Sequence, residues 1–140
     1  MVKYPAIIHN DADGLSIEII DFPTCFTDGA TFDELISNAS EALSLHLRCM
    51  LEDNDDIPEP SEIQGENIVH ITPRYEVALP LILKKRREEL SLRQSDVAEK
   101  MKIPYQTYQK LERGKTFNPT LKTLEKVAKS LGKKLIIDLV

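Results

Sequence analysis

Residues 93 to 115 carry the side chains best suited to contacting a nucleic acid. The amides of Gln106 and Gln109 can each donate and accept at an adenine edge, so we expect both to read bases in double-stranded DNA. Tyr105 is expected to contact a thymine methyl group or a phosphate. The remaining candidates are expected at the phosphate backbone, where contacts position a protein without specifying a sequence: Arg93, Gln94, Lys110, Arg113 and Lys115.

Two short helices around a proline must position these side chains. The sequence predicts helices over "RQSDVAEKM" and "YQTYQKLERG", with "KIP" between them and Gly114 as a C-cap. Apolar residues with the spacing to pack the pair together are Val97, Ala98, Met101, Ile103, Tyr108 and Leu111. A helix-turn-helix of this kind holds its second helix where it can enter a major groove. The alternative is a four-helix domain whose basic face is only solvated.

The same run resembles the Xre/Cro-type helix-turn-helix family over about residues 78 to 132. The matching positions are Gln94, Val97, Ala98, Ile103, Tyr105 to Gln109, Leu111, Glu112, Arg113 and Gly114. The resemblance implies binding of double-stranded DNA as a homodimer. Two positions depart from the family pattern, because Lys102 replaces the usual glycine of the turn and Pro104 replaces the usual serine cap. A less regular turn without a capping bond is therefore expected.

Further elements are expected on both sides of this pair. The segment "VALPLILKKRREEL" predicts a helix that tolerates Pro80 only in its first turn. Another helix is expected to start near Thr120 and to end at Gly132. The terminal "KKLIIDLV" predicts a strand over residues 133–139, which would pair with its counterpart in a second copy of the chain.

The charges of the chain divide sharply between its two halves. Residues 1–76 hold three basic and 16 acidic residues, a net charge of −13, whereas residues 77–140 hold 15 basic and seven acidic ones, a net charge of +8. Such asymmetry indicates two modules with partners of opposite charge. We therefore expect one domain over residues 1–73 and a second, DNA-binding domain over residues 74–140.

The front half has the pattern of a small α+β sandwich. Strands are expected near 3–9 and 15–21, joined by the turn "NDADG", with another strand at "NIVHI" that ends before Pro73. Between them, Thr31 and Glu34 form a capping box for an amphipathic helix over residues 31–51. The predicted fold class is therefore α+β, with this sandwich followed by an all-α helix-turn-helix domain and a terminal strand.

This front half resembles the HicB antitoxin family. The match lies in Asp13-Gly14, Phe22-Pro23, Cys25, Thr27, Gly29, Glu41-Ala42-Leu43 and Ile57-Pro58-Pro60-Ser61, with Thr24 replacing a usual glycine. The resemblance implies an incomplete RNase H-like domain that binds and occludes a HicA-like mRNA-cleaving toxin. HicB-like and Xre-like modules joined in one chain are typical of antitoxins that also repress their own operon.

Two other functions compete with this interpretation: a transcription regulator whose front module senses a small ligand, and a metal-dependent nuclease. Carboxylates of the type that hold catalytic metals are Asp11, Asp13, Glu18 and Asp21. Asp11 and Asp13 fall in the expected turn, and the histidines and cysteines lack a metal-ligand spacing. We therefore expect no enzyme activity, metal or cofactor. Because no apolar run approaches about 18 residues, a cytoplasmic protein is expected.

Overall fold

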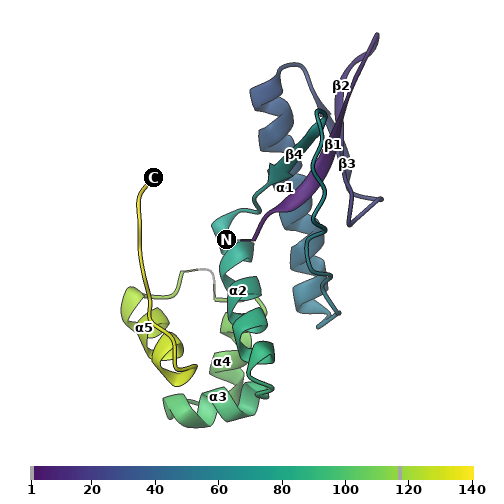
Figure 1. Ribbon diagram of the computed structural model, residues 1–140. Coiled ribbons are helices and arrows are strands. Elements are labelled where there is room, and N and C mark those ends of the chain that lie inside the picture. The colour runs from purple at the N-terminus through teal and green to yellow at the C-terminus, as the bar shows by residue number, and fades with distance from the viewer. Residues whose placement is uncertain (1, 117) are drawn as a thin grey trace. The chain divides into compact units, whose positions relative to one another are not determined.

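The computed structural model describes residues 2–116 and 118–140. Over these residues it contains one four-stranded antiparallel sheet and five helices, a mixed α+β architecture (Figure 1). The chain divides into two compact units, Met1–Ala78, called unit 1, and Leu79–Val140, called unit 2. Residues 77 and 78 are uncharged, so unit 1 carries the net charge of −13 and unit 2 that of +8.

The sheet of unit 1 has the order β3-β2-β1-β4. Its strands are β1 (Tyr4–Asp11), β2 (Gly14–Ile19), β3 (Phe26–Gly29) and β4 (Ile68–Ile71). The predicted β1–β2 hairpin is present, with Asp11 opposite Gly14 and Gly14 at a φ of 123°. β3 was not predicted, because this short edge strand pairs only with β2 and alternates exposed and half-buried positions without an apolar run.

Helix α1 (Phe32–Glu52) packs against β2, β3 and β4. As predicted, Thr31 caps it, since the Thr31 Oγ accepts a bond of 3.2 Å from the Glu34 N–H, and the Glu34 carboxylate accepts from the Ala30 N–H at 3.3 Å. The helix buries an apolar stripe at helical spacing: Leu35, Ala39, Leu43, Leu47 and Leu51. With the buried strand residues Ala6, Ile17, Ile19 and Ile71, this stripe forms the core of unit 1.

Gly29 lies where the end of β3 passes under the first turn of α1. A Cβ at this position would lie 2.6 Å from the Leu35 backbone N and 2.8 Å from its Cα, closer than backbone atoms tolerate. We expect Gly29→Ala to lower the free energy of unfolding by about 1–3 kcal/mol, because α1 must shift off the strand. Urea unfolding followed by circular dichroism at 222 nm measures the change. In Gly65→Ala, the new Cβ meets only an Ile68 side-chain carbon at 3.3 Å, so equal losses in the two variants would contradict the prediction.

The acidic loop between α1 and β4 is held at two points, by Tyr4 of β1 and by Asp21 in the turn after β2. The Tyr4 hydroxyl donates to the Pro58 carbonyl at 2.9 Å, and burial raises the pKa of this tyrosine. The Asp21 carboxylate accepts from the Ser61 backbone N–H at 3.0 Å and from the Ser61 hydroxyl. The Pro58 to Ser61 segment therefore follows a defined path despite its polar composition.

Unit 2 contains most of α2 (Tyr75–Glu89) together with α3 (Gln94–Met101), α4 (Tyr105–Glu112) and α5 (Leu121–Ser130). Its buried core consists of Leu83, Val97, Ala98, Tyr108, Leu111, Val127 and Leu131, with Leu79, Leu92, Met101 and Ile103 packed around it. Of the six residues predicted to pack α3 against α4, four belong to this buried core, and Met101 and Ile103 pack against it, which confirms their predicted packing role. The predicted start of α5 is also confirmed, because the Thr120 Oγ accepts from the Thr123 N–H at 3.1 Å.

Pro80 does not lie in the first turn of its helix, so this sequence prediction was wrong. α2 begins at Tyr75, which makes Pro80 its sixth residue. Proline has no N–H, so the Glu76 carbonyl receives no i→i−4 bond from this position. The first turn of the helix is closed by the Arg74 carbonyl, which accepts from the N–H groups of Val77 and Ala78 at 3.0 and 2.9 Å.

The strand predicted over residues 133–139 is not formed in this single chain. Residues 133–140 have no regular secondary structure and follow α5 as an extended trace (Figure 1). Ile136, Ile137 and Leu139 are 79%, 60% and 95% exposed. A strand requires a hydrogen-bonding neighbour, and the partner expected from the sequence is the same segment of a second copy. That pairing stays a prediction.

Candidate nucleic-acid interface

The turn between α3 and α4 is well closed although glycine is missing from it. Lys102 adopts the left-handed conformation, with φ 57° and ψ 43°. Its N–H donates to the Glu99 carbonyl at 3.1 Å, and the Ile103 N–H donates to the Ala98 carbonyl at 3.1 Å. Pro104 then precedes α4 without a side-chain capping bond, as predicted. The expected irregularity of the turn is therefore absent, although a side chain in this conformation carries a backbone cost.

α4 divides into a buried face and an exposed face. Tyr108, Leu111 and Glu112 are buried, whereas Tyr105, Gln106 and Lys110 are exposed. Five of the predicted site residues line one hollow of about 130 Å³: Gln106, Gln109, Lys110, Arg113 and Lys115. The structure thus places two amides and three cations around a shared depression on the surface of unit 2.

Arg93 has a protein partner at the start of α3. Its guanidinium lies 3.2 Å from the Asp96 carboxylate, and its backbone N–H donates to the same carboxylate at 2.7 Å. The side-chain hydrogen bond to Asp96 is the main cause of the raised pKa of Arg93, whereas the bond from the Arg93 backbone N–H is the main cause of the lowered pKa of Asp96. The Arg93 side chain is 82% exposed. A phosphate contact by Arg93 would therefore compete with a solvent-exposed ion pair.

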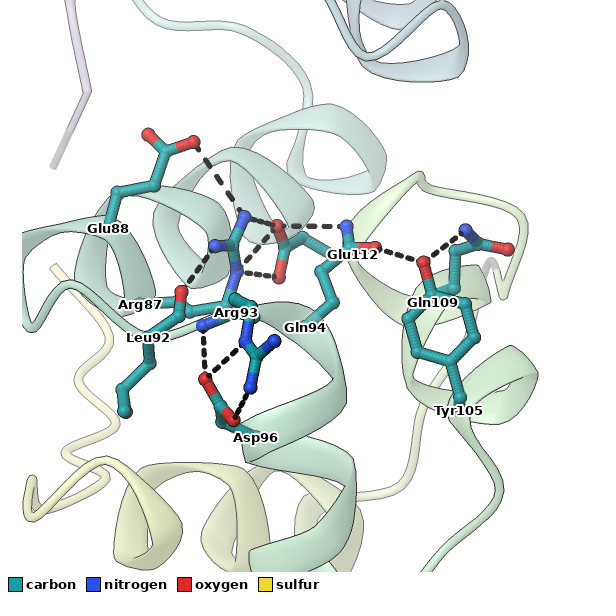
Figure 2. Close-up of polar contacts among 9 residues, drawn as sticks. All are labelled: Arg87, Glu88, Leu92, Arg93, Gln94, Asp96, Tyr105, Gln109 and Glu112. Atoms are coloured by element: carbon teal, nitrogen blue, oxygen red, sulfur yellow. Dashed lines mark hydrogen bonds and ion pairs between the residues drawn. The ribbon is translucent and has the colours of Figure 1, made fainter.

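Arg87 of α2 and Glu112, the last residue of α4, form a buried ion pair that joins the two helices (Figure 2). The Arg87 Nε donates to the two carboxylate oxygens at 3.0 and 2.9 Å, and its Nη2 donates to one of them at 2.5 Å. The Arg87 Nη1 donates to the Leu92 carbonyl at 2.6 Å. Glu112 is 1% exposed, and its hydrogen bond is the main cause of the raised pKa of Arg87.

Sequence reasoning assigned no role to this ion pair. A signal was present, because Arg87 follows Leu83 by four positions and Glu112 follows Tyr108 by four positions. Both charged residues therefore lie on the apolar stripes of their helices. Charges on such stripes are rarely buried unless they are paired. The sequence separation of 25 residues gave no reason to pair them with each other.

Three of the predicted site residues extend from this ion pair as one chain of hydrogen bonds. The Gln94 Nε2 donates to the Glu112 Oε1 at 3.2 Å. The Tyr105 hydroxyl donates to the Gln94 Oε1 at 3.2 Å, and the Gln109 Nε2 donates to the Tyr105 hydroxyl at 2.9 Å. Figure 2 shows the chain running from the buried carboxylate to the surface amide of Gln109. The amide of Gln94, expected at the DNA backbone, is thus engaged inside the protein.

The carboxylates considered for a metal site in unit 1 lie in separate surroundings. Asp21 holds Ser61, as described above, while Asp11 and Asp13 are exposed at the β1–β2 turn. Among residues 2–116 and 118–140, no three His, Cys, Asp or Glu side chains group in a way that could hold a metal ion. Over the same residues, no helix has both the length and the apolar character required to cross a membrane.

Comparison with known proteins identifies the family. Residues 4–113 match the family described as HicB-like antitoxin of bacterial toxin-antitoxin system. The chain is 39% identical over 61 residues to an uncharacterised 14.9 kDa protein from the rep-hol intergenic region of Haemophilus phage HP1. That alignment covers 44% of this chain and 46% of the relative, so the match spans less than half of the relative's length.

A second relative is the UPF0150 protein Ta0767 of Thermoplasma acidophilum. It is 34% identical over 58 residues, which cover 41% of this chain and 84% of that protein. Among solved structures, the Burkholderia pseudomallei antitoxin HicB aligns with 15% identity and a TM-score of 0.47, over 77% of this chain and 90% of that one. Since the family match extends over residues 4–113, well over half of the sequence, the chain belongs to the HicB-like antitoxins of bacterial toxin-antitoxin systems.

Proposed function

We propose that this antitoxin neutralises a HicA-like mRNA-cleaving toxin and represses its own operon by binding operator DNA. Toxin binding is assigned to residues 1–73 and DNA binding to residues 74–140. The observation that carries the DNA-binding role is the hollow on α4, where Gln106 and Gln109 lie among Lys110, Arg113 and Lys115 in a unit of net charge +8. Amides among cations combine base reading with phosphate contacts.

The charge of unit 1 supports the toxin-binding role. At a net charge of −13, this unit repels nucleic acid and attracts a basic protein, such as an enzyme that binds RNA. We further propose that its sheet and α1 are an incomplete RNase H-like domain, in which Asp21 serves to hold the Ser61 loop rather than a metal ion. Mixing the chain with the product of the neighbouring gene and scoring RNA cleavage tests toxin neutralisation directly.

DNA binding is proposed to use a homodimer with α3 and α4 as the helix-turn-helix. The exposed side chains of residues 136–139 would be covered if the terminal segments of two copies paired as strands. Two recognition helices would then meet half-sites about one helical turn apart, roughly 34 Å. Light scattering of the full chain and of a chain ending at residue 132 tests the dimer, which the shorter chain should lose.

Gln106→Ala is expected to weaken binding to the promoter DNA of the operon by about 1–3 kcal/mol. The amide is exposed on α4 and lines the hollow, so its removal leaves the fold intact but deletes a base contact. Fluorescence anisotropy with the promoter duplex and with a random-sequence duplex measures the effect. Affinity for the random duplex should barely change.

Arg113→Ala is the matched control from the same hollow. This change removes a cation and should weaken binding to both duplexes, with a shallower dependence of affinity on salt because fewer counterions are released. Equal loss on both duplexes in Gln106→Ala would rule out the base-reading role. An unchanged salt slope in Arg113→Ala would remove this arginine from the phosphate contacts.

A further inference from the structure

The orientation of a glutamine amide decides which base it can read. Its oxygen accepts and its nitrogen donates, and rotation by 180° exchanges the two with almost no change in shape. Adenine offers an acceptor and a donor in the major groove, so a glutamine reads it only in one orientation. A glutamine free to rotate can also pair with bases that present the reverse order. A fixed orientation therefore sharpens selectivity.

The hydrogen-bond chain of Figure 2 starts from the Glu112 carboxylate, which can only accept hydrogen bonds. Both carboxylate oxygens of Glu112 accept from the Arg87 guanidinium, so Glu112 is an acceptor and cannot donate. The neighbouring Gln94 must then present its nitrogen, which donates to the Glu112 Oε1 at 3.2 Å. The opposite orientation would place an amide oxygen against a buried carboxylate, without a proton between them.

The direction of this first bond determines the next two. With its nitrogen on Glu112, Gln94 presents its oxygen to Tyr105, whose hydroxyl donates its single proton there at 3.2 Å. The Tyr105 oxygen is then left with lone pairs only, and it accepts from the Gln109 Nε2 at 2.9 Å. A rotated Gln109 would bring two acceptors together at that distance.

Gln109 keeps two groups for a ligand after this bond is made. One N–H is used by Tyr105, whereas the Oε1 and the second N–H remain as an acceptor and donor pair at the hollow lined by Gln106, Lys110 and Arg113. An acceptor next to a donor is the pattern that adenine requires. Gln109 is half-buried, so it presents this pair from a restrained position.

We infer that Gln94 and Tyr105 are positioning residues, through which the buried Glu112 carboxylate fixes the orientation of the Gln109 amide for reading adenine. The inference rests on the proposed DNA-binding function and deepens it. It assigns a base to one side chain, and it assigns to Gln94 and Tyr105 an internal role in place of direct contacts with phosphate or thymine.

The hydrogen-bond chain from Glu112 through Gln94 and Tyr105 to Gln109 is called the relay. The test uses the full chain with Tyr105→Phe, which deletes only the hydroxyl from the middle of this relay. Tyr75→Phe is the matched control, since it removes the same hydroxyl from a residue that is 74% exposed and lies on α2. The first measurement needs no DNA and records the side-chain ¹H and ¹⁵N amide signals of Gln109. We expect these signals to shift in Tyr105→Phe and in Gln94→Met and to stay unchanged in Tyr75→Phe.

The second measurement is a selection of binding sites from a pool of randomised DNA duplexes. We expect Tyr105→Phe to reduce the preference for adenine at one position by about threefold to tenfold, with the preferences at other positions retained. Unchanged Gln109 signals would overturn the relay. Shifted signals with unchanged base preferences, or an equal loss at every position, would overturn its role in reading adenine.

The two measurements distinguish a chain that does not bind DNA specifically from one in which Gln109 is not oriented for adenine. If the unmodified chain selects no sequence from the pool, the DNA-binding proposal is overturned, and the assignment of adenine to Gln109 is overturned with it. The amide signals of Gln109 would still decide whether the relay exists. The inference alone is overturned if the Gln109 signals show the relay and the unmodified chain selects a sequence, but Tyr105→Phe leaves the base preferences unchanged.

Discussion

Replacement of Arg87 with alanine is expected to lower the free energy of unfolding by about 3–5 kcal/mol. The change removes the guanidinium from a Glu112 carboxylate that is 1% exposed, so a buried charge loses its cationic partner and keeps the bond of 3.2 Å from the Gln94 amide. It also removes the donor to the Leu92 carbonyl. Urea unfolding of the full chain, followed by circular dichroism at 222 nm, measures the loss, which should fall on the transition of unit 2.

Two control variants separate the effect of burial from that of charge. Arg86→Ala deletes the neighbouring arginine of the same helix, which pairs with Glu89 at 2.9 Å while both side chains are about half exposed, and it should cost less than about 1 kcal/mol. The double variant Arg87→Met with Glu112→Leu removes both buried charges and should recover most of the lost stability. Equal losses for Arg86→Ala and Arg87→Ala would contradict the prediction.

Leu43→Ala is expected to lower the free energy of unfolding by about 2–5 kcal/mol. Leu43 is fully buried on the face of α1 that packs against the sheet, so truncation leaves a cavity in the core of unit 1. The loss should therefore fall on the transition of unit 1 in the same urea experiment.

Leu45→Ala provides the matched control within the same helix. Leu45 is 55% exposed, two positions from Leu43, and its truncation removes the same atoms without opening a core cavity. A change of less than about 0.5 kcal/mol is expected for this surface position. Similar losses at the two positions would show that this face of α1 is not the one packed against the sheet.

The elements with strong local signals were predictable from the sequence. Two runs rich in β-branched residues and the turn "NDADG" between them predicted the β1–β2 hairpin, and Thr31 and Thr120 marked the starts of α1 and α5. β3 lacked such a signal because its conformation depends on pairing with β2. The start of α2 was misplaced because proline is most often found in the first turn of a helix, whereas Pro80 is the sixth residue of this one.

The composition of the candidate site was more predictable than its connectivity. Helical spacing alone places Gln106, Gln109, Lys110 and Arg113 on one side of α4, and the hollow shows them together. The relay from Glu112 to Gln109 could not be predicted, since it links α2, α3 and α4 through side-chain contacts that appear only once the helices are packed. Local patterns report faces of helices and not the partners across them.

The proline inside α2 affects how the chain responds to force. The Glu76 carbonyl lacks its helical hydrogen bond, and the Pro80 ring crowds the same carbonyl. Glu76 lies two residues before Ala78, the last residue of unit 1. Load transmitted along α2 is resisted by one bond fewer at that turn than elsewhere in the helix. Bending of α2 would therefore concentrate at that turn, where Pro80 lies seven positions before Arg87, the residue of the same helix that pairs with Glu112.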